Sequence, residues 1–164
     1  MEILKVENLR KEYGEGNSKV IALDGVNLEI DRGEFVAIVG PSGSGKSTLL
    51  HIIGGVDSPS EGKVYIEGND ISKYTSKELA LFRRRKVGLI YQFYNLIQNL
   101  TVRHNMELPL KLDKRKINEE ILLDTVSKLG IESKLDSFPS ELSGGQQQRV
   151  AIARSLIYKP SIIL

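Results

Sequence analysis

The feature that most constrains this chain is a glycine-rich loop between an unbroken apolar run and an apolar helix. The run comprises residues 35–39, the helical pattern begins at Thr48, and the loop reads Gly40-Pro41-Ser42-Gly43-Ser44-Gly45-Lys46-Ser47. This is the G-x-x-x-x-G-K-S/T spacing of a loop whose backbone N–H groups bind phosphates. Its glycines let several N–H groups turn inward, and a helix that starts at the loop directs its unpaired N-terminal donors at the same anion.

The loop therefore predicts a nucleoside triphosphate as ligand. Lys46 is expected to reach the β and γ phosphates, and Ser47 places a hydroxyl where a bridging Mg²⁺ ion needs an oxygen ligand. A flexible glycine–serine linker is the alternative interpretation. Linkers rarely lie between a buried strand and an apolar helix, so the context favours the phosphate loop.

Composition limits the other classes of function. The 164 residues fit one domain, and 23 Lys and Arg against 21 Asp and Glu leave no overall field directed at nucleic acid or anionic lipid. No cysteine is available for a disulfide or a thiolate metal site, and two histidines are too few for a His-rich site. The start of the sequence lacks the apolar stretch of a signal peptide, so we expect membrane association to come through a partner.

Hydrophobic patterns predict an α/β core beside a small antiparallel β part. The strict alternation of residues 26–30 indicates a half-buried antiparallel strand, whereas residues 35–39 are apolar throughout, as in a parallel strand covered on both faces. Further strands are predicted at residues 3–9, 20–23, 63–66 and 87–91, and one more parallel strand at residues 161–164. Helices are predicted from Ser47 to the Gly54-Gly55 pair and at residues 75–85, 117–129 and 150–158. The second of these would begin with a capping box, because Thr75 and Glu78 have its spacing.

A second candidate anion site lies at Leu142-Ser143-Gly144-Gly145-Gln146, where another helix begins. Taken alone, a Ser-Gly-Gly turn is typical of a helix cap.

The basic cluster at residues 83–86 has no interleaved aromatic residues, so we interpret it as a solvated helix end and expect no nucleic-acid partner.

The phosphate loop, Gln92 after a buried strand, and residues 142–149 together resemble the nucleotide-binding subunit of ATP-binding cassette (ABC) transporters. The resemblance covers essentially the whole chain. It implies a P-loop NTPase fold of class α/β, with a parallel sheet, an antiparallel β subdomain and a helical subdomain. We expect residues 1–164 to form one incomplete nucleotide-binding domain. The β part and phosphate loop would occupy residues 1–75, and the helical subdomain about residues 95–150.

The same resemblance implies ATP and Mg²⁺ as ligands and assigns roles to individual residues. Tyr13 matches an aromatic residue that stacks on adenine, although an ordinary loop tyrosine remains the alternative. Lys46 and Gln92 would act in catalysis, and Ser47 with Gln92 would hold Mg²⁺. Ser143, Gly144, Gly145 and Gln146 would cover the γ-phosphate of a second subunit in a head-to-tail dimer. The full nucleotide-binding set in the chain itself is Tyr13, Gly40, Pro41, Ser42, Gly43, Ser44, Gly45, Lys46, Ser47, Thr48 and Gln92.

Within the family, residues 91–97 and 107–110 resemble exporters of lipoproteins, macrolides or antimicrobial peptides. That subgroup works with a separate membrane permease, which implies a cytoplasmic subunit at the inner face of the membrane. His104 stands where the family pattern suggests an acidic residue, so we interpret it as a surface histidine. A soluble ABC ATPase without a permease is an alternative, whereas kinases and GTPases lack the segment from Leu142 to Gln146.

The resemblance also implies functional residues beyond the sequence given. In the family, an aspartate of the Mg²⁺ shell and a water-activating glutamate follow the strand predicted at residues 161–164. A general base typically contributes about 10²–10⁴ in rate, so we expect these 164 residues alone to hydrolyse ATP poorly or not at all. A non-catalytic nucleotide-binding module is therefore a second alternative. A further strand expected in the core sheet is also absent, which predicts an isolated polypeptide that is unstable, rearranged or assembled through exposed edges.

Overall fold

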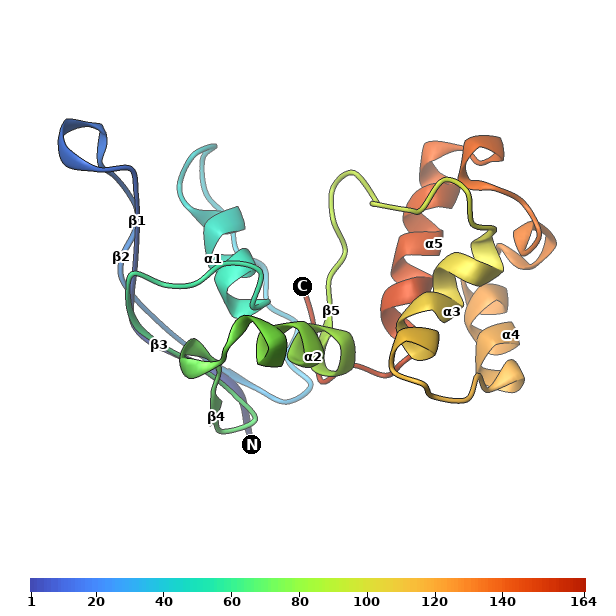
Figure 1. Cartoon of the computed structure of the whole chain (residues 1–164), viewed down its shortest axis with the longest axis horizontal. Helices are drawn as coiled ribbons and strands as arrows, with labels where there is room; N and C mark the ends of the chain where they lie inside the picture. Colours follow the sequence, from blue (N-terminus) through green and yellow to red (C-terminus); the bar gives the residue numbers. More distant parts are fainter. The chain divides into compact units, whose positions relative to one another are not determined.

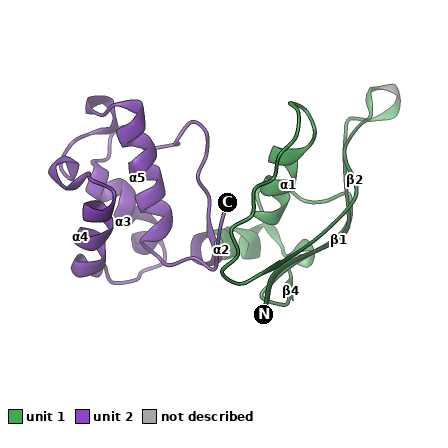
Figure 2. Ribbon diagram, turned by 180° about the vertical axis from the view of Figure 1, so that it is seen from behind, with its two compact units in different colours: residues 1–83 green, residues 84–164 purple. Residues whose placement is uncertain are grey.

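The computed structural model describes residues 1–164 apart from the side chain of Asn17. Its residues form two compact units, residues 1–83 and residues 84–164 (Figure 2). Among the described residues, no helix is long and apolar enough to cross a membrane.

Unit 1 contains a four-stranded antiparallel sheet with the strand order β2-β1-β3-β4. Two long strands, β1 (Glu2–Tyr13) and β2 (Val20–Asp31), form a hairpin (Figure 1). The sheet also contains β3 (Glu61–Ile66), which pairs with β1, and β4 (Asn69–Asp70), which pairs with β3. The strands predicted at residues 20–23 and 26–30 are one strand. An irregularity in the pairing with β1, with Gly25 at φ 67°, absorbs the intervening residues without ending the strand.

Two helices accompany this sheet. The first, α1 (Lys46–Ile53), buries Leu49, Ile52 and Ile53, and its C-cap is Gly54, where the helix was predicted to end. The second, α2 (Ser76–Lys86), begins in unit 1 and ends just beyond its boundary. The backbone N–H and hydroxyl of Thr75 donate to Glu78 Oε2, and the Thr75 hydroxyl accepts from the Glu78 N–H, which confirms the predicted capping box. Two 3₁₀ turns, η1 (Gly16–Ser18) and η2 (Ile71–Lys73), complete the unit.

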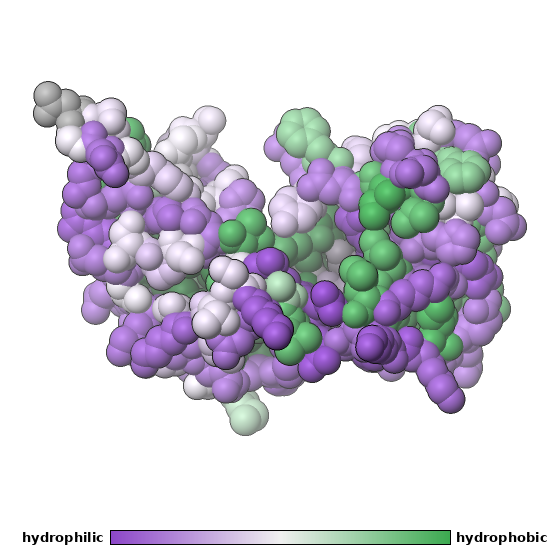
Figure 3. Space-filling view, viewed as in Figure 1, coloured by the Kyte–Doolittle hydropathy of each residue, from purple (hydrophilic) through white to green (hydrophobic). Residues whose placement is uncertain are grey.

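The core of unit 1 includes one face of the sheet. The side chains of Leu4, Val6, Leu9, Val64 and Ile66 are at most 2% exposed, and they come from one face of β1 and β3. The surface of unit 1 that is turned to the viewer in Figure 3 is mainly hydrophilic.

The prediction of a buried parallel strand at residues 35–39 is wrong for this structure. The segment has no regular secondary structure, and Phe35 and Val39 are 99% and 86% exposed. A strand exists only through hydrogen bonds to its neighbours, and the described residues offer no neighbouring strand to this segment. An unbroken apolar run indicates that a segment is suited to burial, but it does not identify the chain segments that cover it.

Unit 2 combines three helices with a short parallel pair. The pair is β5 (Val87–Gly88) and β6 (Ile162–Ile163), and the helices are α3 (Val102–Leu112), α4 (Glu119–Lys128) and α5 (Gly144–Leu156). Two 3₁₀ turns, η3 (Glu132–Lys134) and η4 (Pro139–Glu141), precede α5. The buried core of the helices includes Val102, Met106, Leu122, Val126, Ile131 and Val150.

The parallel pairing of the last predicted strand is confirmed, but β5 is shorter than the predicted span of residues 87–91. The hydrogen bond from Ile90 N–H to Leu164 O, 2.9 Å long, continues the ladder beyond the regular strand. Helix α3 was not predicted, because Pro109 lies inside it. Proline removes one backbone donor, and near the end of a helix this leaves only one carbonyl of the preceding turn without its usual partner.

Candidate nucleotide-binding site

The phosphate loop of unit 1 has the backbone that its glycines predict. Gly43 and Gly45 have φ values of 80° and 85°, in the left-handed region that favours glycine. A Cβ on Gly45 would lie 2.3 Å from the carbonyl oxygen of Ala22, so the loop passes directly against β2. Helix α1 starts at Lys46, and no described side chain caps its N-terminus. The donors and the positive dipole end of this helix are therefore available to an anion.

Lys46 lies over the loop that precedes it. Its ammonium donates to the carbonyls of Gly40 and Pro41, at 2.9 and 2.6 Å, and to the hydroxyl of Ser44 at 3.3 Å. A phosphate oxygen is a stronger acceptor for a charged donor than these neutral groups. A triphosphate bound in the loop would therefore replace these groups as the hydrogen-bond acceptor of the Lys46 ammonium.

Ser47 is exposed on the first turn of α1, where its hydroxyl fits a Mg²⁺ ion that arrives with a nucleotide. Mg²⁺ keeps several waters and is usually held by few protein oxygens together with substrate phosphates. Within the part of the chain that the structure describes, no group of three or more His, Cys, Asp or Glu residues could hold a metal by itself. The Ser47 hydroxyl is the kind of oxygen donor that suits a metal bound together with its nucleotide.

Tyr13 lies at the end of β1 and is 43% exposed. Its hydroxyl donates a hydrogen bond of 2.7 Å to Asp57 Oδ2. Burial, followed by this hydrogen bond, raises the pKa of Tyr13, so the phenol stays protonated and remains a donor at neutral pH. The ring thus combines a fixed hydroxyl with an exposed aromatic surface.

Gln92 is exposed in a turn of unit 2 that follows β5. Tyr94 and Asn95, two and three positions after Gln92, have φ values of 58° and 47°. Their carbonyls accept hydrogen bonds of 2.8 and 2.7 Å from the guanidinium of Arg154 on α5. Partial burial of the Arg154 guanidinium lowers its pKa. The turn that carries Gln92 is therefore fastened to the helix that begins with the second motif.

The segment from Leu142 to Gln146 forms the start of α5 as a capping box. Ser143 Oγ accepts from the Gln146 N–H at 3.4 Å, and Gln146 Oε1 accepts from the Ser143 N–H at 2.9 Å. The helix-cap interpretation is thus borne out as the local structure, and a ligand role of these side chains stays a prediction. A Cβ on Gly145 would meet nothing within 4 Å, and one on Gly144 would make an ordinary contact of 3.6 Å with the Tyr94 hydroxyl. Internal packing therefore does not require either glycine.

The predicted site residues fall into two groups. Tyr13 and residues 40–48 belong to unit 1, whereas Gln92 and residues 143–146 belong to unit 2. Two supporting residues, Asp57 and Arg154, were not predicted. Each is a charged residue outside any motif, and its role depends on backbone and side-chain partners that are distant in sequence.

Comparisons with known proteins agree with these features. The family model for ABC transporters matches residues 23–164. The bacitracin export ATP-binding protein BceA of Halalkalibacterium halodurans is 44% identical over 165 residues, which cover 99% of this chain. The lipoprotein-releasing system ATP-binding protein LolD of Pseudomonas syringae is 44% identical over 99% of this chain. The dimeric structure of the ATP-binding cassette MJ0796 bound to ADP and Pi has a TM-score of 0.90 and 44% identity over 98% of this chain. The chain belongs to the ABC transporter family.

The chain spans only part of these relatives. It covers 65% of the length of the bacitracin export protein, 72% of the lipoprotein-releasing protein and 72% of the solved cassette. The match to the solved cassette, with a TM-score of 0.90, confirms the P-loop ABC ATPase fold class that was expected from the sequence. Residues 35–39 nevertheless form no strand here.

Proposed function

We propose that this chain binds Mg-ATP as the nucleotide-binding subunit of an ABC transporter. The observation that carries the proposal is the phosphate loop at the uncapped N-terminus of α1, in a chain 44% identical to a cassette bound to ADP and Pi. The loop residues 40–48 would hold the phosphates, with Lys46 on the β and γ phosphates. Ser47 and Gln92 would supply oxygens to Mg²⁺, and Tyr13 would stack on adenine.

The proposed partners are a second copy of the subunit and a membrane permease. In the head-to-tail dimer, Ser143, Gly144, Gly145 and Gln146 of one copy would cover the γ-phosphate bound to the other. The open space at Gly145 supports this role, because a nucleotide can approach a backbone that carries no side chain. Relatives named for bacitracin export and lipoprotein release support an exporter at the cytoplasmic face of the membrane.

In the complete protein, closure of this dimer and hydrolysis of ATP would drive the permease, with Lys46 and Gln92 as catalytic residues. The 164 residues alone would turn ATP over slowly or not at all, because none of them matches the water-activating glutamate that the resemblance implies. A non-catalytic nucleotide-binding module is the second candidate. Turnover by the full-length protein that Lys46→Ala abolishes would exclude it.

The proposal is tested by calorimetric titration of the chain with Mg-ATP. Wild type should show saturable binding, and Lys46→Ala should lose it. Lys63→Ala, which removes an exposed lysine of β3 outside the loop, is the matched control and should bind like wild type. Equal binding by wild type and Lys46→Ala would refute the proposed phosphate site.

A further inference from the structure

A firmly held carboxylate lies beside Tyr13. Asp57 follows α1 in unit 1, and its Oδ2 accepts from the Tyr13 hydroxyl at 2.7 Å. Its Oδ1 accepts from the Lys11 ammonium and from the backbone N–H of Ser58, both at 2.7 Å. Burial raises the pKa of Asp57, but the hydrogen bonds from Lys11, Tyr13 and Ser58 outweigh it, and the pKa is lowered overall. Asp57 is therefore an ionised carboxylate fixed by three donors.

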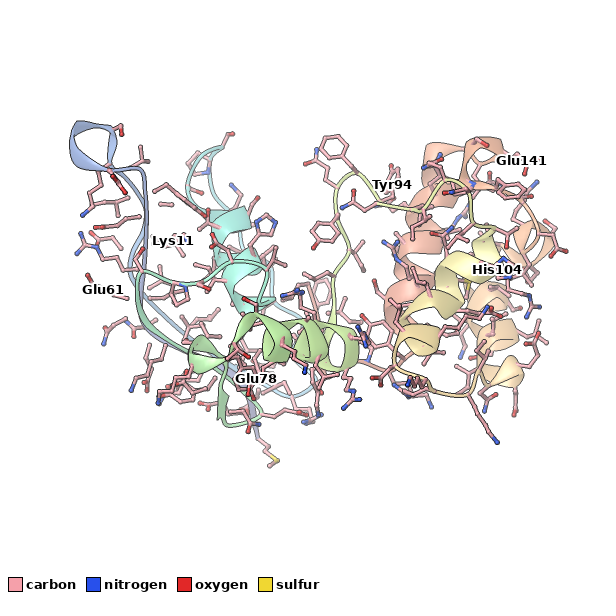
Figure 4. All side chains as sticks on the ribbon, in the orientation of Figure 1. Lys11, Glu61, Glu78, Tyr94, His104 and Glu141 are labelled. Atoms are coloured by element: carbon pink, nitrogen blue, oxygen red, sulfur yellow. The ribbon has the colours of Figure 1, made fainter. Side chains whose placement is uncertain are left out.

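Lys11 contacts the Tyr13 ring as well as the carboxylate. The two residues lie on the same face of β1, because side chains alternate along a strand. The ammonium lies 4.8 Å from the ring centroid, within the range of a cation–π contact. Figure 4 shows Lys11 on the side of β1 nearer α1. Its ammonium also donates to Ser58 O at 2.7 Å, which fixes its position over the ring. The ammonium thus covers one face of the ring, while Tyr13 as a whole remains 43% exposed.

Tyr13 also lies near the phosphate-loop helix. The side chain of Thr48, on the first turn of α1, opposes the rise in the pKa of Tyr13, against the larger effects of burial and Asp57. The ring and the helix end proposed to hold phosphates therefore lie in the same part of unit 1.

We propose that Asp57 and Lys11 are positioning residues for the nucleotide base: they hold the Tyr13 ring in one orientation and leave a single face open for stacking. The inference rests on the proposed function, because it requires ATP at the phosphate loop. Without these bonds, Tyr13 would sample about three staggered χ1 orientations. If one orientation binds the base, the apparent affinity for ATP falls roughly threefold.

The test compares a ligand that has a base with one that has none. Calorimetric titrations with Mg-ATP and with magnesium tripolyphosphate are made on wild type, Tyr13→Phe, Asp57→Ala and the double variant. Tyr13→Phe keeps the ring and almost the same volume, so it remains informative if Asp57→Ala does not fold. Glu78→Ala is the control, because Glu78 is a hydrogen-bonded carboxylate of unit 1 whose bonds are to Thr75.

Each single variant should bind ATP about threefold more weakly and tripolyphosphate with unchanged affinity. The double variant should lose no more than one single variant, because Asp57 acts through the Tyr13 hydroxyl. Unchanged ATP binding, an equal loss for both ligands, or additive losses in the double variant would overturn the inference alone. Failure of wild type to bind either ligand would overturn the proposed function and this inference together.

Discussion

Two glycines of the phosphate loop should respond very differently to the same substitution. Gly43 and Gly45 have nearly equal φ values, 80° and 85°, so alanine at either position adopts a left-handed conformation that costs about 1–2 kcal/mol. A Cβ on Gly43 would meet nothing within 4 Å. A Cβ on Gly45 would lie 2.3 Å from Ala22 O and 2.9 Å from Leu23 Cδ2. Such overpacking lowers the free energy of unfolding by about a further 1–3 kcal/mol, because the neighbouring atoms must shift.

We therefore expect Gly43→Ala to lower the free energy of unfolding by about 1–2 kcal/mol and Gly45→Ala by about 2–5 kcal/mol. Urea unfolding followed by circular dichroism measures both, and Gly43→Ala serves as the matched control for backbone strain. Gly45→Ala should also weaken Mg-ATP binding more, because relief of the clash moves the loop away from β2. Equal losses of stability in the two variants would refute the close approach of the loop to β2.

Three further predictions concern unit 2. Ser143→Ala removes the cap of α5 and should lower the free energy of unfolding by about 1 kcal/mol in urea titrations; no change would contradict the capping box. Burial raises the pKa of Tyr158 to about 12. Because the unfolded value is near 10, wild-type stability should fall as pH rises from about 10 to 12, and more steeply than in Tyr158→Phe. An equal pH slope would contradict this. Arg154→Leu should speed amide hydrogen exchange at Asn95 and in the turn before it, whereas unchanged exchange would show that Arg154 does not hold the turn.

Local chemistry explains which elements could be predicted from the sequence. The phosphate loop, the capping box at Thr75 and the helix start at Ser143 depend on residues within a few positions of one another, so the sequence pattern contains their cause. The last strand was predicted from its apolar run after Pro160, and its parallel pairing was found in the structure.

The sequence patterns missed elements that depend on distant parts of the chain, and one helix that contains a proline. Residues 35–39 have the pattern of a buried strand but no neighbouring strand among the described residues. Helix α3 was not predicted because it contains Pro109, and proline usually indicates that a helix is broken. Near the end of a helix, proline disrupts fewer hydrogen bonds than in the middle. Asp57 and Arg154 support Tyr13 and the turn after Gln92 across long sequence separations, and no local spacing indicates such contacts.

The phosphate site is tested by mapping, with nuclear magnetic resonance on the isotopically labelled chain, the amide N–H groups that respond to Mg-ATP. We expect the largest shift changes at residues 43–48, where the loop meets the N-terminus of α1, and smaller changes around Tyr13. Tripolyphosphate should reproduce the changes at the loop but not those at Tyr13. Saturable ATP binding with the largest changes outside residues 40–48 would contradict the claim that this loop holds the phosphates.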